Sequence, residues 1–359
     1  MMTRLRSAVE SRRSISGGGS AFGAQAARWS PIAVWDRFWF EPGPAARLGL
    51  ARAIFCGAAF FFYLPQDFSE WATAAPVFWM PIWLFETLHV PVISAQSLFV
   101  VQTVWKVSLA GCALGLCTRM STVVAALLGT YLLGLPHNFG ATQHFDTLVV
   151  FALWILAVSH AGDVRSVDNL IRSARGNGRS SRALFGPEYT WPVRAMWMLT
   201  ALVFFGAGTS KLRHSGIEWV MSDNLQLLLM RAYYHVSDGD PLTSLGLFVA
   251  RHPALAHLCA GGALALETFY IAALFSRRAR PFIGAAGILF LVGIRTLMGP
   301  TFEPYLICAL FCIPWHRIEE PLVRLVRRPT PVSLLVDSAY DVCSPPAPEH
   351  APARLDISI

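Results

Sequence analysis

The sequence alternates between long apolar stretches and short polar segments. A helix of about 20 apolar residues, at about 1.5 Å per residue, crosses the roughly 30 Å hydrocarbon core of a membrane. The pattern therefore predicts an all-α, polytopic membrane bundle of about eight transmembrane helices plus interfacial helices. The expected spans are 46–64, 95–116, 120–135, 146–158, 191–208, 253–275, 281–298 and 302–315.

The segments around these spans differ in kind. Residues 35–44 are aromatic and turn-forming, as expected of an interfacial segment, and residues 65–94 contain too many prolines for a span. Residues 1–33 are rich in Arg, Ser and Gly and have no apolar core for a cleavable signal, so they predict a disordered basic leader. A proline-rich tail at 329–359 leaves 34–328 as the expected transmembrane domain.

Composition agrees with a membrane protein that has little soluble mass. The chain is 54% hydrophobic and 14% charged, whereas soluble domains carry roughly 25% charged residues. The formal net charge is +7. Because basic residues in a membrane protein orient the chain and contact lipid, we expect the bilayer and no nucleic acid as a partner.

The positions of Lys and Arg orient the chain. Segments 65–94, 136–145 and 299–301 contain neither residue, and the segments that alternate with them are rich in arginine. Since Lys and Arg are in excess in cytoplasmic loops, we expect a multi-pass protein of the cell membrane with both termini in the cytoplasm. Lys211 and Arg213, after the fifth span, break this rule, which suggests a use for them.

Five ionisable residues are expected near the outer surface of the membrane under this topology: His144, Asp146, Lys211, Arg295 and Glu303. Ionisable groups at membrane depth are costly, so they usually face the bundle interior and pair. The alternative to a functional site is that Arg295–Glu303 and Lys211–Asp146 are structural ion pairs.

Two further charged residues lie within expected spans. Glu267 is expected deeper, close to Arg194 and Arg280 in depth, where a salt bridge would lock helices together. Lys106 lies near the middle of the second span and needs a partner that the sequence does not identify.

Metal and disulfide chemistry are not expected. His137, His144 and Asp146 share one loop, but no matched set of ligands accompanies them elsewhere, so we predict no metal site. Cys308 and Cys312 are one helical turn apart without a neighbouring His or acid at ligand spacing. No cysteine falls in a segment expected on the outer side of the membrane, so a disulfide framework is not predicted.

The most informative stretch is 204–219, FFGAGTSKLRHSGIEW, where a long apolar helix is expected to end. Gly206 and Gly208 lack side chains, so a neighbouring helix or a flat ligand can approach the backbone. Desolvation of a lysine at the edge of an apolar slab favours its neutral form, which would make Lys211 a usable base. The alternative is a lysine that snorkels to the headgroups.

These residues resemble one family. The run GAGTSKLR at 206–213, with Gly216 and Trp219, is similar to the lysine motif in the membrane domain of vitamin K-dependent gamma-carboxylase. That domain also occurs alone in bacteria as the horizontally transferred transmembrane (HTTM) domain. Residues 137–146 and the loop 163–168 resemble the histidine-bearing segment and the following loop of the same family. The likeness covers roughly residues 38–315.

The resemblance implies a quinol site. In the carboxylase, the matching lysine deprotonates reduced vitamin K, and oxygen converts the quinol to a strongly basic alkoxide. That base removes a proton from the gamma carbon of a peptide glutamate, to which carbon dioxide adds. The lysine corresponds to Lys211 and an assisting histidine to His144, so the resemblance implies that both are catalytic. A further family histidine corresponds to Arg295, which cannot act as a neutral imidazole.

Two classes of function therefore stay open. Arg295, and the absence from this sequence of the large soluble domain that handles peptide in the animal enzyme, favour quinol binding over carboxylation. One hypothesis is a bacterial inner-membrane enzyme, a quinol-linked carboxylase (lyase) or oxidoreductase, with reduced quinone (vitamin K or menaquinol) and a secreted peptide as partners. The alternative is a non-enzymatic scaffold or a lipid- or quinone-binding protein. The expected binding residues are His137, Asp146, Arg295, Glu303, Gly206, Gly208 and Trp219.

Overall fold

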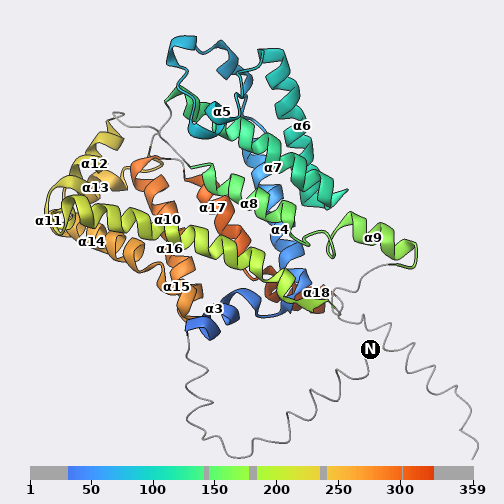
Figure 1. Cartoon of the computed structure of the whole chain (residues 1–359). Coiled ribbons are helices and arrows are strands. Elements are labelled where there is room, and N and C mark those ends of the chain that lie inside the picture. The colour runs from blue at the N-terminus through green and yellow to red at the C-terminus, as the bar shows by residue number, and fades with distance from the viewer. Residues whose placement is uncertain (1–30, 141–144, 178–183, 235–240, 301, 327–359) are drawn as a thin grey trace, which may run out of the picture. The chain divides into compact units, whose positions relative to one another are not determined.

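A computed structural model shows an all-α architecture (Figure 1). It describes residues 31–140, 145–177, 184–234, 241–300 and 302–326, so the expected tail and nearly all of the expected leader lie outside the described residues. The helices are α3 (Pro31–Phe40), α4 (Ala45–Tyr63), α5 (Trp83–Thr87), α6 (Ala95–Leu114), α7 (Thr118–Gly134), α8 (Thr147–Val158), α9 (Val167–Ala174), α10 (Trp191–Ser215), α11 (Glu218–Met221), α12 (Asn224–Tyr233), α13 (Leu245–Ala250), α14 (Pro253–Phe269), α15 (Ala272–Phe275), α16 (Arg280–Met298), α17 (Glu303–Cys312) and α18 (Trp315–Val326).

The chain divides after Pro314 into two compact units, and α18 belongs to the second. In the first unit, short 3-10 helices lie at Ser69–Thr73, Pro76–Phe78, Leu135–Phe139 and Pro187–Tyr189. The described strands are β1 (Gly43–Pro44) and β2 (Phe185–Gly186), which pair antiparallel.

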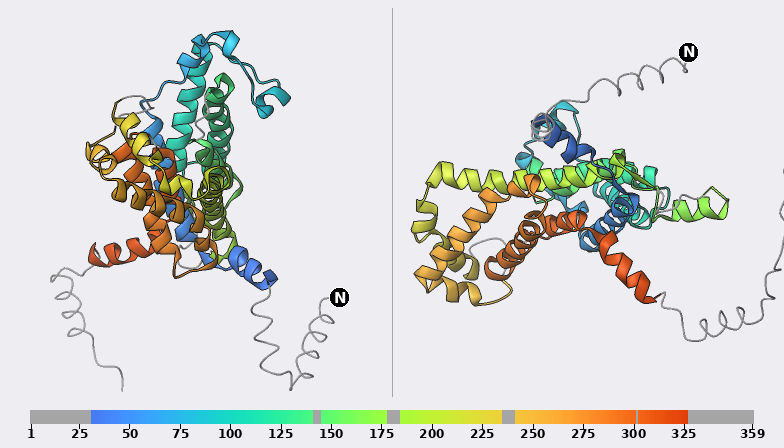
Figure 2. Two further views of the ribbon diagram at one scale, coloured as in Figure 1. Left: turned by 90° about the vertical axis from the view of Figure 1, so that its left-hand side faces the viewer. Right: turned by 90° about the horizontal axis from the view of Figure 1, so that it is seen from below.

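The first unit is built from two groups of helices. Helices α4, α6, α7 and α8 pack together, and α10, α14 and α16 form a second group with the short helices α11, α12, α13 and α15 (Figure 1 and Figure 2). Helix α17 contacts α4 and α8 of the first group and α10 and α16 of the second. It therefore connects the two groups.

The membrane character of the chain is confirmed, whereas the count of about eight crossings is not. Five helices among the described residues are long and apolar enough to cross a membrane. These segments are Ala45–Tyr63, Ala95–Leu114, Thr118–Phe139, Pro187–Ser215 and Arg280–Met298. Helices α8 and α17 are apolar but shorter. Where the sequence predicts a sixth span at 253–275, the structure has α14 followed by a separate α15.

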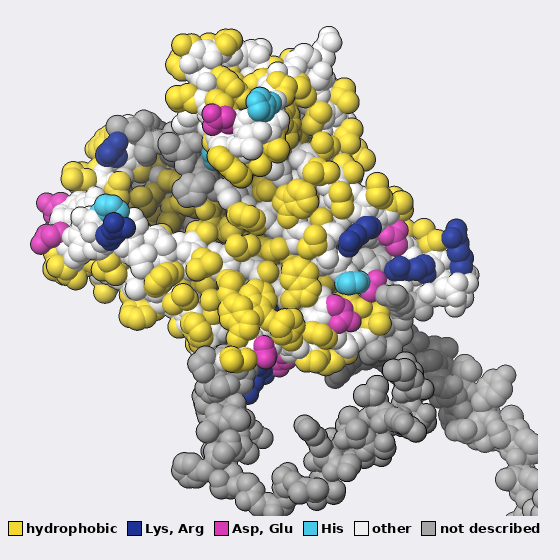
Figure 3. Space-filling model, in the orientation of Figure 1, with side chains coloured by type: hydrophobic (Ala, Val, Ile, Leu, Met, Phe, Trp, Pro, Cys, Tyr) yellow, Lys and Arg dark blue, Asp and Glu magenta, His cyan; other side chains and the backbone are white. Residues whose placement is uncertain are grey.

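Large hydrophobic side chains cover much of the surface (Figure 3). On the long helices, Phe61, Val107, Leu202 and Leu289 are each at least half exposed. Contiguous apolar surface of this kind is costly in water and suits the hydrocarbon core of a bilayer. The bilayer is therefore the environment of these helices.

Helix α4 is the centre of the first group. Its Leu48, Phe55 and Tyr63 are at most 1% exposed. Tyr63 packs against Trp105 of α6, with ring centroids 5.1 Å apart. Phe55 meets Phe311 of α17 edge to face, with centroids 5.8 Å apart. Aromatic packing thus holds α4 against both α6 and α17.

The structure identifies the partner of Lys106. Its Nζ donates to the carbonyl oxygen of Leu64 at 3.1 Å and to that of Gln66 at 2.5 Å, just beyond the end of α4. Carbonyl groups at a helix C-terminus lack intrahelical donors and carry partial negative charge. Lys106 therefore supplies hydrogen-bond donors to the carbonyl groups at the C-terminal end of α4.

Helix caps hold the loop that leads into α9. Ser166 Oγ accepts from the amide of Asn169 at 3.0 Å and is the N-cap of α9. The Asp168 carboxylate accepts from the amides of Cys117 and Thr118 at 2.8 and 2.7 Å, and from Thr118 Oγ1 at 2.7 Å. Asp168 thus caps α7 from another part of the chain. Ser166 and Asp168, in the loop 163–168 that resembles the family, therefore make structural contacts.

Replacing Asp168 by asparagine is expected to destabilise the protein by about 1–2 kcal/mol, because it weakens this cap. Burial raises the pKa of the Asp168 carboxyl, but hydrogen bonds from Thr118 and Cys117 and the charge of Arg172 outweigh burial and lower it overall. A lowered folded-state pKa gives stability that is fully present above the unfolded value of about 3.9 and is lost as the pH falls through the folded value. Thermal unfolding in detergent should separate the two proteins at pH 7, and the difference should begin to shrink only as the pH falls below about 4. An unchanged difference at low pH would contradict this role.

Candidate functional site

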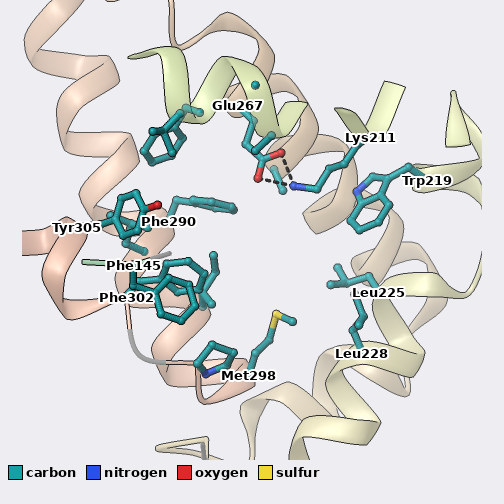
Figure 4. A pocket seen from close by; sticks show the side chains of 18 of the residues that line it. Phe145, Lys211, Trp219, Leu225, Leu228, Glu267, Phe290, Met298, Phe302 and Tyr305 are labelled. Atoms are coloured by element: carbon teal, nitrogen blue, oxygen red, sulfur yellow. Dashed lines mark hydrogen bonds and ion pairs between the residues drawn. The ribbon is translucent and has the colours of Figure 1, made fainter. Parts of the chain in front are cut away.

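A large apolar cavity lies among α10, α14, α16 and α17. Its volume is about 730 Å³, within the range of about 300–1,000 Å³ that is usual for small-molecule sites. Helices α11 and α12 contribute Trp219, Leu225 and Leu228 on one side, and Phe145 lies opposite (Figure 4). Among the described lining residues, the side chains with hydrogen-bonding groups are Lys211, Trp219, Glu267 and Tyr305. The cavity therefore suits a ligand with a large apolar body and a small polar part.

Lys211 and Glu267 form an ion pair in the cavity wall (Figure 4). Lys211 Nζ donates to both carboxylate oxygens, at 2.5 Å to Oε1. The Glu267 side chain is 6% exposed and that of Lys211 is 23% exposed. Nζ also lies 5.1 Å from the centre of the Trp219 ring, within cation–π range. Pairing makes these two charges tolerable in apolar surroundings.

Gly208 allows α10 and α14 to bring the pair together. A Cβ atom at Gly208 would lie 2.7 Å from the amide nitrogen of Thr268 and 3.1 Å from the carbonyl carbon of Glu267. Lys211 is three residues further along α10 and so lies on nearly the same face of the helix. Gly206 instead lines the cavity, and a Cβ there would meet no described atom within 4 Å.

The expected position of Glu267 near Arg194 and Arg280 is wrong. Glu267 pairs with Lys211, whereas Arg194 pairs with Glu41 at 3.1 Å and Arg280 donates to the carbonyl groups of α15. The prediction took residues 253–275 as one span. Because α14 ends at Phe269 and packs beside the second half of α10, its last turns lie level with Lys211.

The alternative ion pair Lys211–Asp146 is also wrong. The carboxylate of Asp146 accepts a hydrogen bond from the Tyr63 hydroxyl of α4, and His137 lies close enough to act on it electrostatically. His144 lies outside the described residues, so its expected position beside Lys211 stays a prediction. Among the described residues, no group of three or more His, Cys, Asp or Glu could hold a metal ion.

The Arg295–Glu303 ion pair is present. Arg295 Nε donates to Glu303 Oε1 at 3.2 Å, and its Nη1 donates to the carbonyl oxygen of Gly299 at 3.0 Å. These contacts bridge the turn between α16 and α17, where Met298 and Phe302 line the cavity. The alternative of a structural ion pair is thus the one that the contacts support, and Arg295 positions one wall of the cavity.

The loop 163–168, which resembles a loop of the family, lies at a different cavity. A smaller cavity of about 180 Å³ is lined by residues at the end of α8 and beyond it, including Ser159, His160 and Asp163. Phe145, at the large cavity, precedes the start of α8. A helix of 12 residues is about 18 Å long. The loop 163–168 therefore does not share a site with the lysine motif at 206–213.

Sequence reasoning missed several cavity residues. Phe290 and Tyr305 line the cavity beside Phe145, and Phe302 stacks edge to face on Phe145 with centroids 4.5 Å apart. Their apolar spans carry no local signal that distinguishes a cavity wall from a lipid-facing surface. Glu267 did carry a signal, because a lone acid in an apolar span needs a cation.

Comparison with known proteins identifies the family. No curated protein and no solved structure matches the chain. A model of the HTTM domain matches residues 40–316, which are most of the chain and include Lys211, Glu267 and the cavity around them. The chain is a membrane protein that belongs to the HTTM domain family.

Proposed function

We propose that the large cavity binds a reduced quinone, with its ring and tail against the apolar wall and a hydroxyl group against the Lys211–Glu267 pair. The observation that carries this proposal is a single ion pair set in a cavity of about 730 Å³ whose remaining lining is largely apolar. Phe290 and Phe302 supply aromatic rings for a flat ligand (Figure 4), and ring pairs of this kind are favourable.

The ion pair gives the cavity both a hydrogen-bond donor and an acceptor. The ammonium of Lys211 can donate to an oxygen of the ligand, and the carboxylate of Glu267 can accept from a hydroxyl group. An ammonium cannot accept a proton, so Lys211 acts as a base only after losing a proton, and Glu267 is the acceptor that it contacts. We therefore assign Glu267 as the proton acceptor in the catalytic role that the resemblance implies for Lys211.

Carboxylation is not part of the proposed function. No finding on this chain supports addition of carbon dioxide to a peptide glutamate, and a secreted peptide partner stays an expectation. Quinol binding and deprotonation require the cavity and the ion pair, both of which are described. The second candidate function, a non-enzymatic lipid binder, is favoured by the same apolar lining, which would also accept an acyl chain.

We also propose that shorter helices complete about eight crossings, with both termini in the cytoplasm of the cell. Helices α8 and α17 are apolar, and together with α14 they pack against the long helices and would bring the five candidates to eight crossings. The segments without Lys or Arg at 65–94, 136–145 and 299–301 support this orientation. Two variants that each carry a single cysteine, at Val77→Cys or at Arg175→Cys, test this orientation. A labelling reagent added from the outside should modify the first and spare the second.

Binding is tested by thermal unfolding of the purified protein in detergent with menaquinone or menaquinol. A ligand at about 100 times its Kd should stabilise the protein by about 2.7 kcal/mol. Leu228→Trp fills the cavity and should abolish this stabilisation, whereas Leu227→Trp is the matched control, because Leu227 is 57% exposed on the same helix. Stabilisation that both variants retain would contradict the proposal.

The same measurement separates the two candidate functions. If a phospholipid stabilises the protein through the cavity and neither menaquinone nor menaquinol does, the protein is a lipid binder. If menaquinol binds, its oxidation in oxygenated buffer should depend on Lys211, and equal turnover by Lys211→Ala would exclude Lys211 as a base.

A further inference from the structure

Four arginines gather where α4, α10 and α16 begin, away from the large cavity. Arg47 lies in the first turn of α4, Arg194 near the start of α10, Arg277 just before α16 and Arg280 at its first residue. The positive charges of Arg194, Arg47 and Arg277 all act on Arg280. The four guanidinium groups therefore form one cluster, which we call the arginine cluster.

Glu41, between α3 and α4, neutralises only part of this charge. Its Oε2 is 3.1 Å from Arg194 Nη2 and 2.5 Å from Arg277 Nη2. The guanidinium groups of Arg194, Arg277 and Arg280 and the carboxylate of Glu41 sum to a formal charge of +2 for these four residues. Guanidinium groups that lie close together repel one another, and the repulsion is stronger where burial excludes water.

Buried donors in the arginine cluster lack acceptors. Arg194 is 5% exposed and Trp197 is 6% exposed. Arg194 Nε and Trp197 Nε1 have no hydrogen-bond partner among the described residues. Trp197 also lies under Arg280, whose guanidinium carbon is 5.8 Å from the Trp197 ring centre. Unpaired buried N–H groups are costly, and both groups are donors, so the missing partner is an acceptor.

The helix geometry adds to the positive potential. Helices α4, α10 and α16 are membrane-crossing candidates and all begin at the arginine cluster. The N-terminus of each helix carries partial positive charge that favours an anion. Starts of membrane-crossing helices lie at headgroup depth, where phosphate is the abundant anion.

Aromatic residues place the neighbouring helix α3 at the same depth. Trp35 and Phe40 of α3 are 55% and 61% exposed, and Phe38 packs against the Arg194 guanidinium at 5.3 Å. Exposed Trp and Phe beside a membrane-crossing helix are typical of the membrane–water interface. A lipid headgroup at this depth would lie beside the arginine cluster.

We propose that the arginine cluster binds the phosphate group of an anionic phospholipid. Arg194, Arg277 and Arg280 supply charge-assisted hydrogen bonds to the phosphate oxygens. Glu41 competes with the phosphate for Arg194 and Arg277. This site is separate from the large cavity and holds a lipid from the headgroup side.

The test is native mass spectrometry and thermal unfolding of the full chain in neutral detergent with added phosphatidylglycerol, phosphatidylcholine or inorganic phosphate. Phosphatidylglycerol should bind and raise the unfolding temperature, and phosphatidylcholine should do neither. Arg277→Gln should weaken phosphatidylglycerol binding about tenfold, equivalent to about 1.4 kcal/mol. The Arg277 side chain is 58% exposed, so this variant should fold. Arg175→Gln, an exposed arginine in the segment after α9, is the matched control and should bind as the wild type does.

A variant with the opposite expected effect on lipid binding separates binding from stability. Glu41→Gln removes the competing carboxylate, so it should tighten phosphatidylglycerol binding although it loses two ion pairs. Leu228→Trp should leave phosphatidylglycerol binding intact, which distinguishes this site from the large cavity. Equal binding by Arg277→Gln and Arg175→Gln, or equal stabilisation by phosphatidylcholine, would overturn the proposal. Equal binding of inorganic phosphate would show a free anion in place of a lipid.

Discussion

Replacing Glu267 by alanine is expected to destabilise the protein by about 3–5 kcal/mol, the usual cost of leaving one charge of a buried pair without its partner. The carboxylate receives Lys211 Nζ on both of its oxygens and is 6% exposed. Without it, the ammonium faces an apolar wall and the Trp219 ring. Unfolding by denaturant in detergent, followed by circular dichroism, measures the loss.

The double variant Lys211→Met with Glu267→Leu is the control for this prediction. Replacing both charges by apolar side chains of similar size removes the unpaired charge, so most of the lost stability should return. The double variant should nonetheless fail to bind a quinol, because the cavity then lacks its donor and acceptor. If the double variant is as unstable as Glu267→Ala, the loss comes from packing and the ion pair has little energetic weight.

The long helices could be predicted closely from the sequence. The expected spans 46–64, 95–116 and 281–298 correspond to Ala45–Tyr63, Ala95–Leu114 and Arg280–Met298. An apolar run of membrane length has one stable structure in lipid, a helix that satisfies its own backbone groups. Length and hydropathy therefore suffice for such elements.

The ends and breaks of helices could not be predicted in this way. Helix α10 continues to Ser215, beyond the expected end at 208, so Lys211 lies within the helix rather than just after its end. Helix α14 ends at Phe269 although the apolar pattern continues. Hydropathy reports the surroundings of a residue and carries no information about which helix stops beside which neighbour.

The candidate site was predicted in part for the same reason. Lys211, Trp219 and Gly208 follow from one local motif, and all three meet in or beside the cavity wall. The partner Glu267 depends on the register between α10 and α14, which is a tertiary property. The sequence offered Asp146 only as an alternative partner of Lys211, and the structure has Glu267 in that place.

Replacing Gly208 by valine is expected to separate α10 from α14 and to cost at least about 1–3 kcal/mol through overpacking. The new Cβ would lie 2.7 Å from the amide nitrogen of Thr268, and this neighbour is backbone that cannot rotate away. Displacement of α14 would also draw Glu267 away from Lys211. The variant should therefore lose stability and quinol binding together, as measured by thermal unfolding with and without the ligand.

Gly206→Val is the matched control, since both glycines lie two residues apart in α10 and the change in helix propensity is the same. A Cβ at Gly206 meets no described atom within 4 Å and projects toward the cavity that this residue lines. Its stability should stay near that of the wild type, while ligand binding weakens because the side chain occupies cavity volume. Equal destabilisation by the two variants would show that the close approach of α10 and α14 does not hold the ion pair in place.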